Sequence, residues 1–170
     1  MRVLGIDPGL RVAGYAVVDL QPGAADPTLV EAGVIRLNQK QSVAERLVQL
    51  HADLQGLLAE LEPACVAVEQ VFAHVKHVRT AIVMGHGRGA VLLAAAQAGL
   101  PIEEFSPAEI KKALTGRGQA SKGQMQRAVM HQFGLRSLPE PPDVADAIAI
   151  AATAARRVAL RRMEPAHRHG

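Results

Sequence analysis

Residues 2–19 of the chain read Arg2-Val-Leu-Gly-Ile-Asp-Pro-Gly-Leu-Arg-Val-Ala-Gly-Tyr-Ala-Val-Val-Asp19. The apolar run that ends at Asp7 is typical of a short β-strand, and the Pro8-Gly9 pair directly after it is a strong turn signal. Residues 12–19 form a second strand candidate. This segment therefore predicts a β-hairpin in which a carboxylate stands at the end of the first strand.

Beyond the hairpin, strand and helix patterns alternate. Residues 29–37 favour a third strand. Residues 42–61 space their leucines three or four apart, and Ser42 with Glu45 forms a capping-box signature, so this range predicts an amphipathic helix. The apolar strand that follows at 65–69 completes a strand, helix and strand succession, which usually forms a parallel crossover on a sheet. The later elements that we predict are a strand at 101–105 and helices at 78–98, 107–114, 123–133 and 142–162.

The hairpin and the crossover together predict an α/β fold. Five strand candidates and five helix candidates are present, and they include both antiparallel and parallel connections. We therefore expect a five-stranded mixed sheet flanked by helices.

Size and composition restrict the class of protein further. The chain has 170 residues, which fits one domain, and only 2% of them are aromatic, so a surface of stacked aromatic side chains is excluded. The single cysteine, Cys65, excludes an internal disulfide and fits a reducing compartment. No apolar run is long enough to span a membrane. We expect a soluble cytoplasmic protein with no membrane partner, in which residues 1–160 form the domain and residues 161–170 a basic, disordered tail.

The net charge of +3 hides strong local imbalances. Residues 71–136 carry nine basic and three acidic side chains, whereas residues 1–70 carry five basic and nine acidic ones. A basic block of this kind suits a polyanionic partner such as a nucleic acid. The acidic residues inside apolar segments need a different explanation.

Four acidic residues stand in apolar surroundings. Asp7 and Glu69 each end an apolar strand, and Asp143 and Asp146 lie three residues apart, hence on one face of the last predicted helix. Taken alone, each has a structural explanation: a turn former, a strand-end charge that points to water, or a carboxylate favoured near a helix N-terminus. Asp146 is the hardest to explain in this way, because its helical neighbours are apolar.

The four carboxylates are predicted to meet, because strand ends and helix starts are where an α/β sheet presents its ligand site. Like charges about 4 Å apart repel by roughly 4 kcal/mol at an effective dielectric constant near 20, unless a cation neutralises them. Oxygen ligands suit Mg²⁺ or Mn²⁺, and two such ions about 4 Å apart are the usual apparatus of phosphodiester hydrolysis. We therefore predict a site that holds two ions of Mg²⁺ or Mn²⁺.

Three segments resemble, in order and spacing, the signature segments of bacterial RuvC-type Holliday junction resolvases, which are crossover junction endodeoxyribonucleases. They are Gly5-Ile-Asp-Pro-Gly-Leu-Arg-Val-Ala-Gly-Tyr15, Val68-Glu-Gln-Val-Phe72 and Asp143-Val-Ala-Asp-Ala-Ile-Ala-Ile-Ala151. The first alone also resembles the opening hairpin of actin-like ATPases and sugar kinases, but those proteins need two such lobes, which 170 residues do not supply. The second and third segments make the resemblance specific.

The resemblance implies an RNase H-like fold and a homodimer that nicks two opposed strands of a four-way DNA junction in recombination and repair. By position, Asp7, Glu69, Asp143 and Asp146 match the family's four catalytic, metal-binding carboxylates. The resemblance also implies association with branch-migration proteins of the RuvA and RuvB type.

Candidate DNA contacts follow from the resemblance and from the charge distribution. Lys111 and Lys122 match family lysines near the scissile phosphate, and Arg117 lies in the glycine-rich segment between them, which could otherwise be a solvated loop. Phe72 matches an exposed aromatic residue that stacks on an unpaired base, although a core position would also suit it. We predict that Phe72, Lys111, Arg117 and Lys122 bind DNA.

Two other functions stay open at this point. A junction-binding protein without catalysis would keep the basic residues but could lose the acidic ones, all four of which are present here. An RNase H-like nuclease that acts on RNA/DNA hybrids would carry the same carboxylates. The sequence favours a junction-resolving endonuclease, and a comparison of substrates would separate the three.

Overall fold

The structure, a computed structural model, describes residues 1–71 and 78–163. It contains the predicted mixed sheet of five strands, in the order β3-β2-β1-β4-β5. β1, β2 and β3 pair antiparallel, whereas β1 with β4 and β4 with β5 pair parallel. The predicted hairpin and parallel crossover are therefore confirmed. The strands are β1 (Arg2–Asp7), β2 (Val12–Asp19), β3 (Thr28–Arg36), β4 (Cys65–Glu69) and β5 (Ile102–Phe105).

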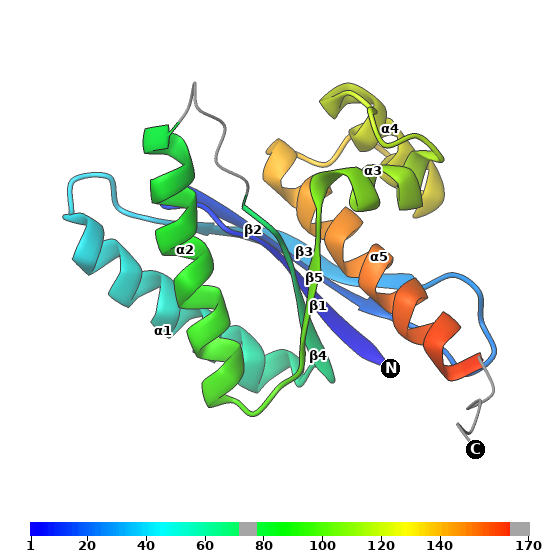
Figure 1. The fold of residues 1–170 in the computed structure, drawn as a ribbon, viewed down its shortest axis with the longest axis horizontal. Helices are drawn as coiled ribbons and strands as arrows, with labels where there is room; N and C mark the ends of the chain where they lie inside the picture. Colours follow the sequence, from blue (N-terminus) through cyan, green and yellow to red (C-terminus); the bar gives the residue numbers. More distant parts are fainter. Residues whose placement is uncertain (72–77, 164–170) are drawn as a thin grey trace, which may run out of the picture.

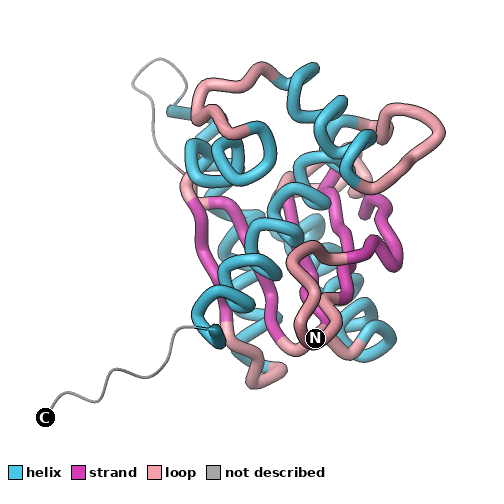
Figure 2. The backbone as a smooth tube through the Cα atoms, turned by 90° about the vertical axis from the view of Figure 1, so that its right-hand side faces the viewer, coloured by secondary structure: helices cyan, strands magenta, loops and turns pink. Residues whose placement is uncertain are grey.

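Within the described residues, five helices cover the two faces of this sheet (Figure 1). One face carries α1 (Val43–Leu61) and α2 (Val78–Gln97). The other carries α3 (Pro107–Thr115), α4 (Lys122–Gln132) and α5 (Pro142–Met163), with α3 and α4 beside the start of α5. Figure 2, turned by 90°, shows the strands enclosed between the helices.

Serine caps fix where three of the helices begin. The Ser42 hydroxyl accepts a hydrogen bond from the backbone N–H of Glu45, and the Glu45 carboxylate accepts one from the backbone N–H of Ser42, as the capping-box signature predicted. Ser106 and Ser121 begin α3 and α4 in the same reciprocal way. The cap at Ser121 makes Lys122 the first residue of α4.

The last helix is longer than the tail prediction allows. α5 ends at Met163, so it extends into the segment from residue 161 onward that was expected to be a tail. The rest of that segment, residues 164–170, lies outside the described residues. None of the helices in the described part of the chain is long and apolar enough to cross a membrane.

The alternation of side chains on the central strands divides the hydrophobic core into two layers. On β1, Val3 belongs to the layer under α5, whereas Leu4 and Ile6 belong to the layer under α1 and α2. The residues of β4 alternate in the same way. Asp7 and Glu69 continue this alternation at the ends of their strands, so both belong on the α5 side of the sheet.

The backbone of α5 packs directly against the backbone of the sheet, because β1 and β2 carry glycine at the contact points. A methyl group added at Gly5 would lie 2.5 Å from backbone atoms of Ala147 and Ala151. One added at Gly14 would overlap the backbone carbonyl of Asp143 and lie 2.6 Å from its carbon. Such distances leave no room for a side chain, so only glycine permits this approach. The start of α5 is thereby held against β1 and β2.

Candidate active site

Two of the four predicted carboxylates meet at the ends of neighbouring strands. β1 and β4 run parallel, with Ile6 opposite Val68 in the register. Asp7 and Glu69 are the next residue on each strand, and both belong to the side of the sheet that α5 covers. The carboxyl ends of the strands are the usual ligand position in open α/β sheets.

The other two carboxylates come from the start of α5. Asp143 lies in its first turn, directly over Gly14, which pairs with Asp7 across the hairpin. Asp146 follows almost one turn later on the same helix face. The close contact at Gly14 thus brings both α5 carboxylates to the end of β1.

All four carboxylates line one pocket of about 370 Å³. Lys111 from α3 and Lys122 from α4 line it as well, so five secondary-structure elements supply its charged groups. The structure therefore brings together six of the eight residues predicted for the site. The complete lining is Asp7, Pro8, Gly9, Glu69, Met84, Pro107, Ile110, Lys111, Lys122, Met125, Asp143 and Asp146.

Burial and mutual repulsion raise the pKa values of three of these carboxyl groups, Asp7, Glu69 and Asp146. Burial, followed by repulsion from Asp146, Asp143 and Glu69, raises the pKa of Asp7 to about 7. Burial, followed by repulsion from Asp146, raises the pKa of Glu69 to about 7. Burial also raises the pKa of Asp146, with a further contribution from Asp143. Without a cation, the pocket therefore disfavours the charged state of its own carboxylates.

The two lysines partly compensate for this repulsion. The Lys122 ammonium acts to lower the pKa values of Asp7, Glu69 and Asp146, and Lys111 acts in the same direction on Glu69 and Asp146. Lys122 is thus the cation that the acidic groups share most widely. Its position follows from the Ser121 cap, which places the first turn of α4 beside the pocket.

The carboxylates fit a hard divalent cation by chemistry, although they do not form a preformed cage. Their donors are all oxygen atoms, which suits Mg²⁺ or Mn²⁺. In residues 1–71 and 78–163, no three Asp, Glu, His or Cys side chains converge closely enough to hold a metal ion as they stand. The backbone positions of the four carboxylates are set by the register of β1 with β4 and by the packing of α5 against Gly5 and Gly14.

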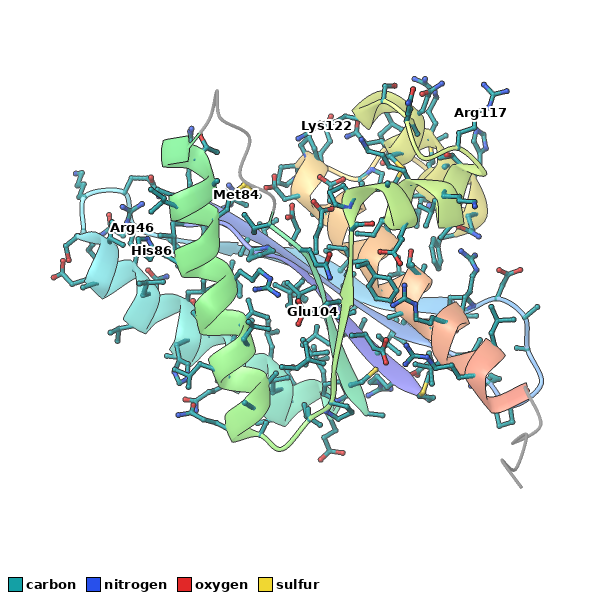
Figure 3. The ribbon with its side chains drawn as sticks, in the orientation of Figure 1. Arg46, Met84, His86, Glu104, Arg117 and Lys122 are labelled. Carbon is teal, nitrogen blue, oxygen red and sulfur yellow. The ribbon has the colours of Figure 1, made fainter. Side chains whose placement is uncertain are left out.

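The structure does not bring the remaining two predicted residues into the pocket. Arg117 is exposed and does not line it, and Figure 3 shows it on the far side of the α3 and α4 region from Lys122. Its predicted role at the glycine-rich segment is therefore not a role at the carboxylates. Phe72 lies outside the described residues, and so does Lys76, which follows it in the same segment.

Sequence reasoning missed the contribution of α2 to the pocket. Met84 lines the pocket next to the carboxylates, and Figure 3 shows it on the side of α2 that faces the site. It lies within an apolar helix and is one of five methionines, so no sequence signal distinguishes it from a core residue. Pro107 and Ile110 of α3 add further apolar lining.

A larger hollow of about 560 Å³ lies elsewhere, between β3 and residues 135–141. Its charged lining consists of two carboxylates, Glu31 and Glu140, and two guanidinium groups, Arg36 and Arg136. These charges balance, whereas the smaller pocket gathers four carboxylates and two lysines. The smaller acidic pocket is therefore the candidate active site.

Comparisons with known proteins show the family to which the chain belongs. A family model described as crossover junction endodeoxyribonuclease RuvC matches residues 3–154. The chain is 47% identical over 148 residues to the crossover junction endodeoxyribonuclease RuvC of Rhodopirellula baltica, which covers 87% of this chain and 82% of the relative. It is also 47% identical over 151 residues to the protein of the same name from Halorhodospira halophila, which covers 88% of this chain and 87% of the relative.

Solved structures agree with this result. The RuvC protein of Thermus thermophilus, in complex with a Holliday junction substrate, is 35% identical to this chain and superposes with a TM-score of 0.85, covering 95% of this chain and 96% of that one. The match therefore extends over nearly the whole of both chains. The chain therefore belongs to the RuvC family of crossover junction endodeoxyribonucleases, which are metal-dependent nucleases with an RNase H-like fold.

Proposed function

We propose that this protein resolves four-way DNA junctions by nicking two opposed strands. The observation that carries the proposal is the pocket in which four carboxylates from β1, β4 and α5 stand beside two lysines from α3 and α4. Carboxylates suit the ions of phosphodiester hydrolysis, and lysines suit the phosphate. Relatives named crossover junction endodeoxyribonuclease, and a neighbour solved with a Holliday junction, support the choice of substrate.

In this proposal Asp7, Glu69, Asp143 and Asp146 are the catalytic residues, and together they hold two ions of Mg²⁺ or Mn²⁺. The support is their oxygen-only donor set, together with the burial and mutual repulsion that raise the pKa values of Asp7 and Glu69 to about 7. When bound, such ions activate a water molecule and stabilise the leaving oxygen. The chain itself positions the carboxylates. The strand register positions Asp7 and Glu69, and the packing of α5 on Gly5 and Gly14 positions Asp143 and Asp146.

Lys111 and Lys122 bind phosphate groups next to the cut. Residues 110–139 carry six basic and no acidic side chains, so this basic region extends away from the pocket over α3 and α4. Contacts to phosphate give affinity and position without reading sequence. Arg117, exposed on the same region, contacts a phosphate further from the cut. Phe72 stacks on an unpaired base near the crossover, a role that rests on the sequence resemblance alone.

The active species is a homodimer, because two cut strands related by two-fold symmetry need two sites related in the same way. The exposed face of α2 is the candidate interface. Ile82 and Leu93 are 55% and 52% exposed there, and a methyl group added at Gly85 or Gly89 would meet nothing within 4 Å. These four residues follow helical spacing and form one apolar strip that a second copy can cover.

The protein acts in the cytoplasm, alongside branch-migration proteins of the RuvA and RuvB type. The basis is the family resemblance and the charge pattern, in which an extended basic region adjoins an acidic pocket. Junction binding without catalysis would not require the four converging carboxylates. Cleavage of RNA/DNA hybrids would use the same carboxylates, so a comparison of substrates distinguishes it.

The exchange Asp7→Asn tests the proposal. It removes one negative charge from the centre of the acidic cluster, so we expect cleavage of a synthetic four-way junction in Mg²⁺ to be lost while junction binding in a gel-shift assay persists. Asp53→Asn, an exposed acidic position on α1, is the matched control and should cut normally. An Asp7→Asn protein that cuts at the parental rate would sink the assignment.

A second assay compares substrates at equal concentration. The parental protein, in Mg²⁺, is given a four-way junction, a linear duplex and an RNA/DNA hybrid of matched length. We expect paired nicks in the junction only. Hybrid cleavage at a comparable rate would establish the RNase H-like alternative, and tight junction binding without any cleavage would establish the non-catalytic one.

A further inference from the structure

The turn between β1 and β2 carries part of the pocket and is held from outside the hairpin. Asp7 ends β1, and Pro8 and Gly9 of the turn line the pocket beside it. The next residue, Leu10, has a backbone carbonyl that accepts a hydrogen bond from Arg46 Nη1 at 2.7 Å and another from Gln39 Nε2 at 3.1 Å. Two side chains distant in sequence therefore converge on one carbonyl of the active-site turn.

The same two side chains form a closed network around the turn. Gln39 Nε2 also donates to the backbone carbonyl of Leu37 at 3.1 Å, and Arg46 Nη1 lies 3.5 Å from Gln39 Oε1. The backbone N–H of Leu37 donates in turn to the carbonyl of Arg11 at 3.1 Å. Arg46 Nε is buried and has no hydrogen-bond partner among the described residues, and the Arg46 side chain as a whole is half-buried.

α2 closes the turn from another direction. A methyl group added at Gly87 would lie 3.6 Å from the carbonyl carbon of Gly9, so the α2 backbone passes close to the turn. Figure 3 labels Arg46 near the start of α1, on the side of the sheet that α2 also covers. The Pro8-Gly9-Leu10 turn is therefore confined by Arg46 and Gln39 through its carbonyl and by Gly87 through its backbone.

We propose that Arg46 is a positioning residue for the active site. With Gln39 it holds the Leu10 carbonyl, and through that bond it fixes the turn that sets where the Asp7 carboxylate enters the pocket. A hydrogen bond from a charged donor is shorter and stronger than one between neutral groups, and the 2.7 Å length at Arg46 fits this. Arg46 itself is not part of the pocket lining. The inference rests on the proposed function, because it deepens the role of Asp7.

α1 offers a matched comparison for this role. Gln49, almost one turn after Arg46 on the same helix, donates through Nε2 to the backbone carbonyl of Arg36 at 3.1 Å. That bond ties α1 to the end of β3 and does not reach the turn. Removing it tests the general anchoring of α1, whereas removing the Arg46 bond tests the anchoring of the turn.

The experiment compares Arg46→Met, Arg46→Lys and Gln49→Met as full-length proteins. Methionine keeps much of the apolar stem of arginine and has no donor, and lysine restores one charged donor. For Arg46→Met we expect kcat for junction cleavage to fall about tenfold with KM unchanged, because a small displacement of a catalytic group is costly. Arg46→Lys should recover part of this loss, and Gln49→Met should leave both constants unchanged.

A second readout does not depend on activity. Mn²⁺ is titrated into the metal-free proteins and its binding is followed by calorimetry. Arg46→Met should bind Mn²⁺ several-fold more weakly than the parent, whereas Gln49→Met should bind it equally. If Arg46→Met fails to fold, Gln39→Leu removes the second donor to the same carbonyl and should change kcat and Mn²⁺ affinity in the same direction.

Parental kcat and Mn²⁺ affinity in folded Arg46→Met would overturn the inference, as would equal losses in Gln49→Met, which would indicate that α1 anchoring in general is at work. Asp7→Asn separates this failure from failure of the proposed function. If Asp7→Asn is inactive while Arg46→Met is fully active, only the positioning role is wrong. If Asp7→Asn is active, the proposed function itself is wrong.

Discussion

The two sides of the active-site pocket are built in opposite ways. The acidic side stands on β1, β4 and α5, and Gly5 of β1 and Gly14 of β2 let the α5 backbone pack directly on the sheet. The basic side stands on α3 and α4, two short capped helices, and its Lys122 is exposed. A group that must place an ion needs a fixed backbone, whereas a flexible ammonium can still find a phosphate if its helix shifts slightly.

The two sides also differ in electrostatic cost. Asp7, Glu69 and Asp146 are partly buried and all have raised pKa values, so the acidic side opposes its own ionisation. Lys122 lowers the pKa values of all three groups, and Lys111 lowers those of Glu69 and Asp146. Rigid packing beneath the acidic side therefore holds together carboxylates that repel one another. The lysines of the basic side reduce this repulsion.

The largest expected effect comes from disturbing the rigid side through Gly14→Ala. The added methyl group would overlap the backbone carbonyl of Asp143, so α5 must move away from the sheet. We expect a loss of about 3 kcal/mol in the free energy of unfolding. We also expect a loss of about 100-fold in cleavage rate per folded molecule, because Asp143 and Asp146 shift with the helix. Urea denaturation and junction cleavage measure the two quantities.

Gly56→Ala is the control for this substitution. Gly56 lies in the interior of α1, and a methyl group added there meets nothing within 4 Å. Alanine in place of an unconstrained helical glycine should raise the free energy of unfolding by about 0.5 to 1 kcal/mol and leave cleavage unchanged. If Gly14→Ala were as active and as stable as the parent, the inference that close packing at Gly14 positions α5 would be wrong.

A smaller effect is expected on the basic side, from Lys122→Ala. Lys122 faces three of the carboxylates and, in the proposal, a phosphate, so we expect a fall of about 2 kcal/mol, or about 30-fold, in kcat/KM for the junction. Steady-state cleavage measures this. The free energy of unfolding in the presence of metal should change little, because the side chain is exposed.

Arg117→Ala separates the pocket lysine from the outer basic region. Arg117 is exposed and outside the pocket, so its loss should cost about 0.5 kcal/mol, or about twofold, in junction affinity. It should also reduce the salt dependence of binding by about one unit of slope. Equal losses for Lys122→Ala and Arg117→Ala would contradict the distinction between the two regions.

These contrasts show what local sequence patterns can predict. Asp7 and Glu69 each end an apolar run, and the Pro8-Gly9 turn signal follows Asp7, so the two strands and the positions of their ends could be predicted. Asp143 and Asp146 share a helix face by their spacing alone. The pairing of the two sets also follows, because parallel strand ends and helix starts meet at one edge of such a sheet.

What the sequence could not predict depends on contacts between distant elements. Nothing near Gly14 in sequence indicates that it must admit the Asp143 backbone, and nothing near Met84 indicates that α2 reaches the pocket. Arg117 shares its segment with Lys111 and Lys122, yet the path of the chain between α3 and α4 directs it elsewhere. The Arg46 contact with Leu10 spans 36 residues and leaves no periodic signal.

The last expected effect is on the pH dependence of stability in the metal-free protein. The pKa values of Asp7 and Glu69 are about 7 in the folded chain, whereas unfolded carboxyls titrate near pH 4. Between these values the folded state binds more protons than the unfolded state, so the free energy of unfolding falls as pH rises from about 5 to about 8. Because the groups are partly exposed, we expect a decrease of about 1 to 2 kcal/mol, measured by urea denaturation with a chelator present.

Three variants assign this pH dependence to the pocket. Asp7→Asn replaces a partly buried carboxylate by a neutral amide, so it should flatten the decrease and be more stable than the parent at pH 8. Lys122→Ala removes a compensating cation and should steepen the decrease. Asp53→Asn, on the exposed surface of α1, should follow the parental curve. If Asp7→Asn kept the full parental slope, the repulsion on the acidic side could not be what the lysines relieve, and the two sides of the pocket would be electrostatically independent.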